Sequence, residues 1–279
     1  MSILQDHKGA MWFATWDGLN KFDGYTFTTY KASQGSEISL TNNRVDYMWE
    51  DKYGYFWLQT YDNRIHRFNP STEIFEQVPA SGEGAFMNIT SVKVLDNGTV
   101  WLLTEKEGAI RVLIDPKDHS LSSEMFSIKS GGFPANHFNN IYLDSSGREW
   151  LMTNNGLGMI PPGERETVSY FAENRPHARG NDLEFYSFAE NEKELFLGAE
   201  SGHVWRFSKE EERFQLLELP VKSFVSSIEC LSDGNILFVT STEGCFIYNP
   251  VTNRHTHYSP KEYKELSNSP ILSVYIDKG

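Results

Sequence analysis

Hydrophobic residues recur along the chain in short runs, separated by polar turns rich in Gly and Asp. In the first such unit the pattern predicts four strands, at residues 3–6, 12–15, 19–22 and 26–30. The second strand of each unit is apolar at nearly every position, which is typical of a strand covered on both faces. The fourth strand mixes apolar and polar residues, as a strand nearer water does. We therefore predict an all-β fold.

One turn signature recurs between the first and second strands of the units. It reads DHKGAMW at 6–12, DKYGYFW at 51–57 and DSSGREW at 144–150, which share the spacing Asp-x-x-Gly-x-x-Trp. A copy that is one residue shorter, DNGTVW, stands at 96–101, and weaker copies stand at 190–196 and 233–237. Aligned copies lie 41 to 49 residues apart. This is the period of a four-stranded propeller blade, about 40 to 50 residues.

The repeats predict a β-propeller of four-stranded antiparallel blades, of the seven-bladed type, with six complete blades and the start of a seventh. We expect a single domain over 1–279, with blades at about 1–38, 39–84, 85–134, 135–180, 181–221 and 222–265 and a partial seventh at 266–279. The first strand of the seventh is expected at 271–276. Because a chain that ends inside a blade leaves a sheet edge exposed, we expect the native polypeptide to extend beyond both ends of this sequence.

The signature residues have distinct physical tasks. An Asp at the start of the turn accepts backbone N–H bonds, and the Gly three residues later can take a positive φ. The Trp then fills the gap between adjacent sheets. We assign Trp12, Trp57, Trp101 and Trp150 as structural anchors rather than as a ligand platform.

Composition and charge exclude several classes of protein. The 279 residues are 14% aromatic, which argues against disorder, and no apolar run of about 18 residues offers a membrane span. The 38 acidic and 25 basic side chains give a net charge of −13. This charge repels nucleic acid and anionic lipid. No signal-peptide pattern is visible at the start of the chain.

The two cysteines are predicted to be free, buried thiols. Cys230 falls on the first strand of the sixth unit and Cys245 on the third. Two strand spacings of about 4.8 Å exceed the roughly 7 Å limit between bridged Cα atoms.

The repeats resemble those of a known family. The segments SILQDHKGAMWFATWDGLNKFDGYTF at 2–27 and SLTNNRV at 39–45 look like the regulator-propeller repeats of Bacteroides-type hybrid two-component sensors. The fifth and sixth copies depart from the pattern because they lack the Trp, and the second has Asn63 where a Gly is usual.

This resemblance implies a periplasmic segment of an inner-membrane sensor that recognises oligosaccharides. Members of the family carry a second propeller, a β-sandwich, a transmembrane helix, a histidine kinase, a receiver and a DNA-binding module, and they signal as homodimers by phosphorelay. The kinase, the receiver and the DNA-binding part are not in this sequence, so this segment is expected to be noncatalytic and to bind no nucleic acid.

Propeller ligands usually meet the loops at one end of the blades, where the turn between strands two and three gathers with the connection between blades. A sugar site needs an aromatic face to stack on a ring, and planar amide, carboxylate or guanidinium groups to bond hydroxyls. The ligand-binding candidates of these types are Trp16, Asp17, Arg44, Tyr61, Arg64, Asn155 and Arg179. Each has a structural alternative, since Asp and Asn form turns and an exposed Arg is commonly solvated.

Two other function classes stay open. A propeller polysaccharide lyase or glycosidase requires two ionisable groups that approach one another and carry perturbed pKa values. A protein-binding scaffold requires a contiguous apolar patch. No catalytic residue, cofactor or metal site is predicted. His255 and His257 share one face of a strand, but no third ligand stands nearby.

Overall fold

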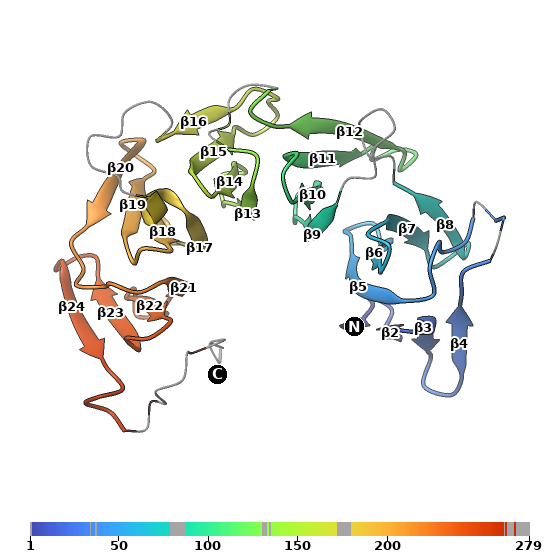
Figure 1. Ribbon diagram of the computed structural model, residues 1–279, viewed down its shortest axis with the longest axis horizontal. Coiled ribbons are helices and arrows are strands. Elements are labelled where there is room, and N and C mark those ends of the chain that lie inside the picture. Colours follow the sequence, from blue (N-terminus) through green and yellow to red (C-terminus); the bar gives the residue numbers. More distant parts are fainter. Residues whose placement is uncertain are drawn as a thin grey trace. The chain divides into compact units, whose positions relative to one another are not determined.

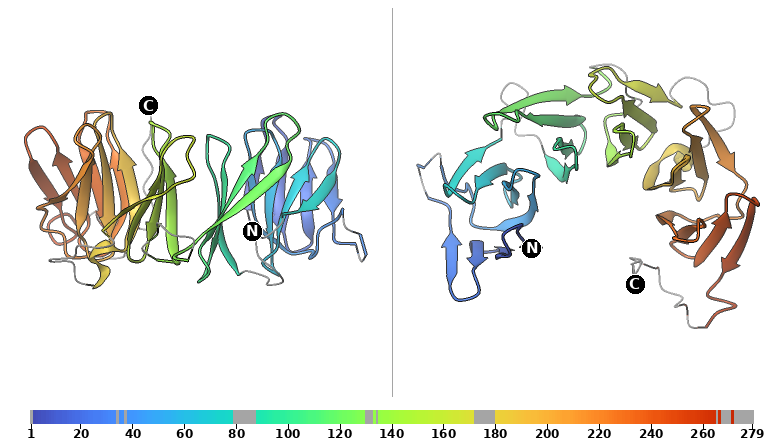
Figure 2. Two further views of the ribbon diagram at one scale, coloured as in Figure 1. Left: turned by 90° about the horizontal axis from the view of Figure 1, so that it is seen from above. Right: turned by 180° about the vertical axis from the view of Figure 1, so that it is seen from behind.

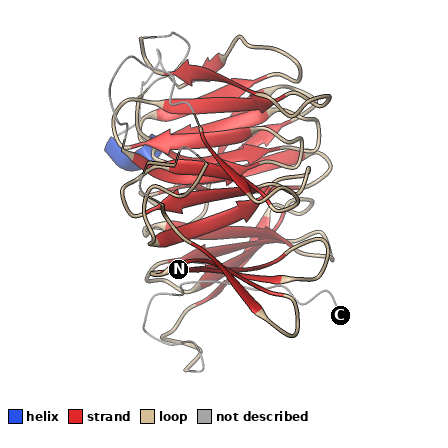
Figure 3. Ribbon diagram, turned by 90° about the vertical axis from the view of Figure 1, so that its right-hand side faces the viewer, coloured by secondary structure: helices blue, strands red, loops and turns tan. Residues whose placement is uncertain are grey.

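Strands make up nearly all of the regular structure. The computed structural model describes residues 2–33, 35–36, 38–78, 88–129, 133, 135–171, 180–264, 266 and 271. Over these ranges the regular elements are 24 strands and one short 3-10 segment, η1 (Gly180–Leu183), which Figure 3 colours blue. A search of the same ranges finds no helix with the length and hydropathy of a membrane span.

Six four-stranded antiparallel sheets follow one another along the chain, each with its strands in sequence order (Figure 1). They are β1 (Ser2–Gln5), β2 (Met11–Thr15), β3 (Gly18–Phe22) and β4 (Phe27–Tyr30); β5 (Val45–Glu50), β6 (Phe56–Thr60), β7 (Ile65–Asn69) and β8 (Ile74–Gln77); β9 (Ile89–Val94), β10 (Val100–Thr104), β11 (Ala109–Ile114) and β12 (Leu121–Phe126); β13 (Phe138–Leu143), β14 (Glu149–Thr153), β15 (Gly156–Ile160) and β16 (Val168–Tyr170); β17 (Phe185–Glu190), β18 (Glu194–Ala199), β19 (Val204–Ser208) and β20 (Arg213–Leu217); and β21 (Val225–Cys230), β22 (Ile236–Thr240), β23 (Cys245–Asn249) and β24 (Arg254–Tyr258).

These sheets confirm the predicted fold class, an all-β propeller built of four-stranded antiparallel blades. The four strands predicted for the first blade agree with β1 to β4 to within one residue at each end. The strand expected at 271–276 lies, apart from Ile271, outside the described residues.

The blades group into two compact units. The first, Met1–Gly131, holds the three blades from β1 to β12, and the second, Gly132–Gly279, holds the three from β13 to β24. Figure 2 draws the strands of the first unit from blue to green and those of the second from green to red.

Within each unit, neighbouring blades pack through aromatic side chains. In the first unit, fully buried Trp12 packs in one cluster with Leu58 and Phe68 of the next blade. In the second unit, Trp150 packs likewise with Leu197 and Phe207. Each buried Trp contributes at most about 4 to 6 kcal/mol through the area it removes from water.

An aspartate in the preceding turn holds each of three tryptophans. The indole Nε1 of Trp150 donates to Asp144 Oδ2 at 2.8 Å. The other oxygen, Oδ1, accepts the backbone N–H groups of Ser146 and Arg148, each at 2.9 Å. The pairs Trp12–Asp6 and Trp57–Asp51 repeat the indole bond at 2.8 and 3.0 Å. The carboxylate thereby closes the turn and fixes the ring that fills the next interface.

The sequence alignment suggested that the third copy of the turn is one residue shorter than the others. The structure shows that it has the same length. The N–H of Leu95 bonds to the Thr99 carbonyl and that of Gly98 to the Leu95 carbonyl, which is the pattern that Asp6, Gly9 and Ala10 make in the first blade. Leu95, and not Asp96, therefore occupies the aspartate position, six residues before Trp101. Since a Leu side chain accepts no hydrogen bond, Asn97 Oδ1 instead accepts the N–H of Thr99 at 2.9 Å.

Asn63 replaces the usual Gly in the turn between β6 and β7 without breaking it. Its φ is +58°, in the left-handed region that Asn tolerates better than most residues. Its N–H bonds to the Thr60 carbonyl at 2.9 Å, as Gly202 bonds to Ala199 in the fifth blade.

Both cysteines are free, as predicted, but they are half-buried rather than fully buried. Cys230 lies on β21 and Cys245 on β23, with β22 between them. The register places the two thiols on opposite faces of the sheet, with Cys230 packed against the core cluster that includes Phe196 of the fifth blade. Burial nevertheless raises the pKa of Cys230 to about 11, so the thiol stays protonated at neutral pH.

Replacing the turn carboxylate tests its structural task. We expect Asp144→Ala to lower the free energy of unfolding by about 2 to 4 kcal/mol, because it leaves the buried Trp150 indole and two backbone N–H groups without their acceptor. Urea denaturation followed by circular dichroism measures this loss. Asp233→Ala is the matched control, since Asp233 stands exposed in the corresponding turn of the sixth blade; an equal loss in both variants would refute the assigned task.

Candidate functional site

The turn between strands two and three lies against the residue that precedes strand one of the same blade. In five blades the same backbone hydrogen bond makes this junction: the N–H of a residue in the turn donates to the carbonyl of the residue before strand one, at 2.9 to 3.1 Å. The donor and acceptor residues are Tyr61 and Arg44, Glu105 and Asn88, Asn154 and His137, Glu200 and Glu184, and Ser241 and Phe224. The two kinds of loop therefore share one end of each blade, which we call the loop end.

Three candidate residues meet at the loop end of the first two blades. The guanidinium carbon of Arg44 lies 5.6 Å from the centre of the Trp16 ring and 4.3 Å from that of the Tyr61 ring. Both rings are mostly exposed, Trp16 at 67% and Tyr61 at 60%. These three residues, the loop-end cluster, present two aromatic rings to solvent with a planar cation between them.

Hydrogen bonds orient the loop that carries Arg44. The Asn43 carbonyl accepts the N–H of Gly18 at 2.7 Å, and the Asn43 side-chain oxygen accepts the N–H of Ala32 at 2.8 Å. Arg44 Nε donates to Asp46 Oδ1 at 2.8 Å. The guanidinium is thus held in place from one side, while its other N–H groups can meet a ligand.

Two further candidates of the first unit are ion-paired. Asp17 Oδ2 accepts from Lys31 Nζ at 2.6 Å in an exposed pair next to Trp16 in the chain. Arg64 Nε lies 3.7 Å from Asp62 Oδ2. The pair of Asp17 and Lys31 is exposed and therefore weak, so Asp17 can exchange this partner for a ligand at low cost.

The remaining two candidates are not brought into the loop-end cluster. Asn155 belongs to the second unit, where its backbone N–H donates to Thr153 Oγ1 at 3.1 Å. Arg179 lies outside the described residues.

A buried histidine anchors the start of the same loop. His66, on β7, is fully buried, and its Nε2 lies 2.9 Å from Thr41 Oγ1, while its Nδ1 has no partner among the described residues. Burial lowers the pKa of His66 to about 4, so the ring is neutral at pH 7. Sequence reasoning missed this residue, because a His within an apolar strand carries no signal of what faces it.

The lowered pKa of His66 makes a testable contribution to stability. The unfolded chain takes up a proton near pH 6.5 and the folded chain only near pH 4, so this contribution is complete above pH 6.5 and is lost as the pH falls towards 4. The loss is about 3 kcal/mol. Urea denaturation at a series of pH values should show this slope in the native chain and not in His66→Gln; parallel pH profiles would contradict it.

In the second unit, two carboxylates occupy the repeat positions of Arg44 and Tyr61. Glu184 precedes β17 and Glu200 follows β18. A hydrogen bond with Glu184 raises the pKa of Glu200 above its usual range. Tyr186 also donates its hydroxyl to Glu184 Oε1 at 2.7 Å. Sequence reasoning did not single out this pair, which becomes apparent only when the backbone bonds align the blades.

The histidines of β24 are engaged within their own blade. His257 Nε2 lies 2.7 Å from the Glu243 carbonyl, and its ring stacks on Phe246 at 4.0 Å. Among the described residues, no group of three His, Cys, Asp or Glu side chains is placed to hold a metal ion.

Comparisons with known proteins establish the fold. No family model and no curated protein sequence matches the chain. Among solved structures, the extracellular domain of the putative hybrid two-component system BT3049 from B. thetaiotaomicron is 22% identical with a TM-score of 0.60, covering 99% of this chain and 37% of that one. The extracellular domain of the putative one-component system BT4673 from the same organism is 21% identical, with a TM-score of 0.59 and coverages of 99% and 36%.

A streptogramin B lyase structure is 15% identical, with a TM-score of 0.52, and the match covers 85% of this chain and 75% of that one. The chain therefore spans little more than a third of the two extracellular domains, and most of the lyase. The extracellular domains agree with the sensor-propeller resemblance of the repeats.

Proposed function

We propose that this chain is a noncatalytic, ligand-sensing segment of a two-component sensor, that it lies in the periplasm, and that it binds an oligosaccharide at the loop-end cluster. The observation that carries this proposal is the exposure of Trp16 and Tyr61 on either side of Arg44. Similarity to extracellular domains of bacterial signalling systems supports the sensing part.

The chemistry of the cluster suits a sugar. The face of a pyranose ring carries C–H groups that pack on an aromatic ring, and its hydroxyls accept and donate hydrogen bonds around the edge. Trp16 and Tyr61 supply exposed rings, while Arg44 supplies N–H donors in a fixed plane. Paired Asp17 and Lys31, beside Trp16, add an acceptor and a donor for further hydroxyls.

Signalling would follow from differential binding. An oligosaccharide that binds one arrangement of the propeller better than another shifts the population towards that arrangement. The partners in this scheme are a second propeller, a β-sandwich and a histidine kinase of the same polypeptide, in a homodimer that passes the signal on by phosphorelay. Residues of those modules would then share in forming the complete site.

Oligosaccharides prepared from a panel of plant and host polysaccharides, titrated into the chain by calorimetry, test the proposal. We expect at least one to bind saturably, and Trp16→Ala and Tyr61→Ala each to weaken it about 5- to 10-fold through loss of a stacked ring. Tyr25→Ala is the control, because Tyr25 is 93% exposed on the same blade but lies between β3 and β4, at the other end. The site assignment is wrong if Tyr25→Ala weakens binding as much, and the proposal fails if none of the panel binds.

A polysaccharide lyase or glycosidase is the second candidate function, favoured by the hydrogen bond between the Glu184 and Glu200 carboxyl groups, which raises the pKa of Glu200. We expect no product when the chain is incubated with the same polysaccharides, as judged by chromatography of reducing ends and by absorbance of unsaturated sugars. If product forms with the native chain and is lost in Glu200→Gln, the chain is an enzyme and the noncatalytic sensing proposal is wrong.

A further inference from the structure

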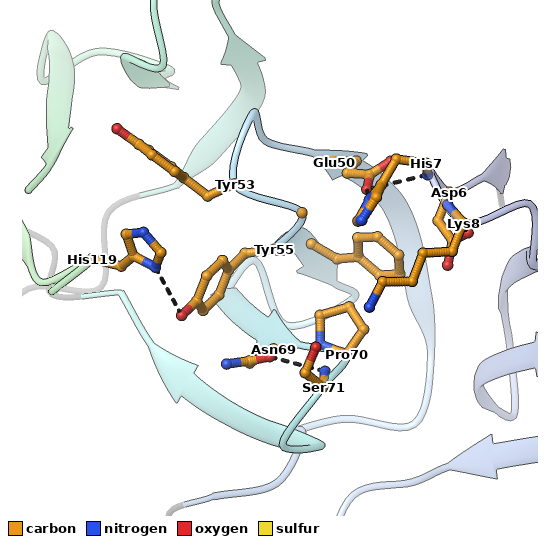
Figure 4. A pocket seen from close by; sticks show the side chains of 12 residues that line it. Asp6, His7, Lys8, Glu50, Tyr53, Tyr55, Asn69, Pro70, Ser71 and His119 are labelled. Carbon is orange, nitrogen blue, oxygen red and sulfur yellow. Dashed lines mark hydrogen bonds and ion pairs between the residues drawn. The ribbon is translucent and has the colours of Figure 1, made fainter. Parts of the chain in front are cut away.

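A cavity of about 230 Å³ opens in the first unit, at the end of the blades away from the loop-end cluster. Its walls come from the turns between strands one and two of the first two blades and from the turns between strands three and four of the second and third (Figure 4). This volume is below the range of about 300 to 1,000 Å³ typical of drug-sized ligands. It suits a single ring.

One wall of the cavity is aromatic and rigid. The His119 ring packs on Tyr53 at 4.6 Å and meets the Tyr55 ring edge-on at 5.5 Å, and its Nδ1 lies 3.3 Å from the Tyr55 hydroxyl. Behind them, the buried guanidinium of Arg67 stacks 3.8 Å from the Tyr55 ring centre and donates to the His119 carbonyl at 2.6 Å. Figure 4 shows both tyrosines and His119 on one side of the pocket.

The turn itself does not require these tyrosines. Tyr53 and Tyr55 stand two and four residues after Asp51, where only their backbone N–H groups bond to the carboxylate. The same positions in the fourth blade hold Ser146 and Arg148, with the same two backbone bonds. The two aromatic side chains are therefore additions to the repeat, and both line the cavity.

Both carboxylates that line the cavity already accept hydrogen bonds or an ion pair, whereas two of its donors have no partner among the described residues. Asp6 already accepts from the Trp12 indole and from two backbone N–H groups, and Glu50 Oε1 lies 2.5 Å from His7 Nδ1. In contrast, the ammonium of Lys8 and the amide nitrogen of Asn69 have no hydrogen bond or ion pair within the described part of the chain, where Lys8 donates only its backbone N–H and the Asn69 side chain uses only its oxygen. A ligand that supplies acceptors, above all a carboxylate, satisfies both.

We propose that this cavity binds a single six-membered ring that carries a carboxylate, with the ring against Tyr53 and Tyr55 and the carboxylate on Lys8. A uronic acid and an aromatic carboxylic acid share this chemistry. The site is separate from the loop-end cluster and does not depend on the function proposed for it.

Glucuronate, benzoate and glucose, each titrated into the chain and followed by saturation-transfer NMR and calorimetry, test this site. We expect a carboxylate to bind at least about tenfold more tightly than glucose, with an affinity that falls as salt is added. Binding of glucuronate alone identifies the source as a sugar acid, and binding of benzoate alone identifies an aromatic acid.

Matched variants locate the binding. Lys8→Met should weaken the carboxylate about tenfold and remove most of the salt dependence. Lys193→Met changes an exposed lysine at the same turn position of the fifth blade, and it should change neither the affinity for the carboxylate nor its salt dependence. Trp16→Ala should likewise leave both unchanged. The inference is overturned if glucose binds as tightly as either acid, if neither acid binds, or if Lys8→Met and Lys193→Met behave alike. None of these outcomes bears on the loop-end cluster, which Trp16→Ala reports separately.

Discussion

A carboxylate held in a tight turn, bonded to the indole of a tryptophan six residues later, sets the geometry of half the blades. In these turns one oxygen of Asp6, Asp51 or Asp144 accepts the indole N–H and the other accepts two backbone N–H groups. The same bonds that close the hairpin thus orient the largest buried side chain of the interface. Packing between blades follows, since each ring fills the gap before the next sheet.

Because the Asp and Trp side chains and the backbone bonds are enough to form these turns, many of the other side chains in the turns have no structural task. At the loop end of the first two blades, the side chains of Trp16 and Tyr61 are exposed, and Tyr61 contributes only its backbone N–H to the bond with the Arg44 carbonyl. At the opposite end, Tyr53 and Tyr55 contribute only N–H groups to their turn. The aromatic groups that can meet a ligand are thus departures from the repeat, whereas the buried ones are the repeat itself.

The same distinction explains how far the sequence was informative. Strand positions in the first blade were predictable to one residue, because short apolar runs and the Gly- and Asp-bearing turns between them are local signals. The repeat also predicted that Trp16, Arg44 and Tyr61 lie near one another, because it places the turn between strands two and three and the connection between blades at the same end of the blade. The third turn was misaligned because Leu95 and Asp96 are adjacent and only the backbone bonds distinguish them.

Other features depend on contacts between blades that no local pattern encodes. The neutral, buried His66, the pairing of Glu184 with Glu200, and the aromatic cavity around His119 each combine residues from separate turns or strands. A histidine or glutamate in isolation is most often solvated or structurally satisfied, so the sequence gives no reason to single it out.

Acrylamide quenching of tryptophan fluorescence tests the central claim most directly. Of the seven tryptophans, all within the described residues, Trp16 alone is exposed, so the readily quenched emission reports the loop-end cluster. The account predicts that an oligosaccharide that binds the chain shields this emission from acrylamide at saturating concentration. An oligosaccharide that binds with measurable heat and leaves the quenching unchanged would contradict it.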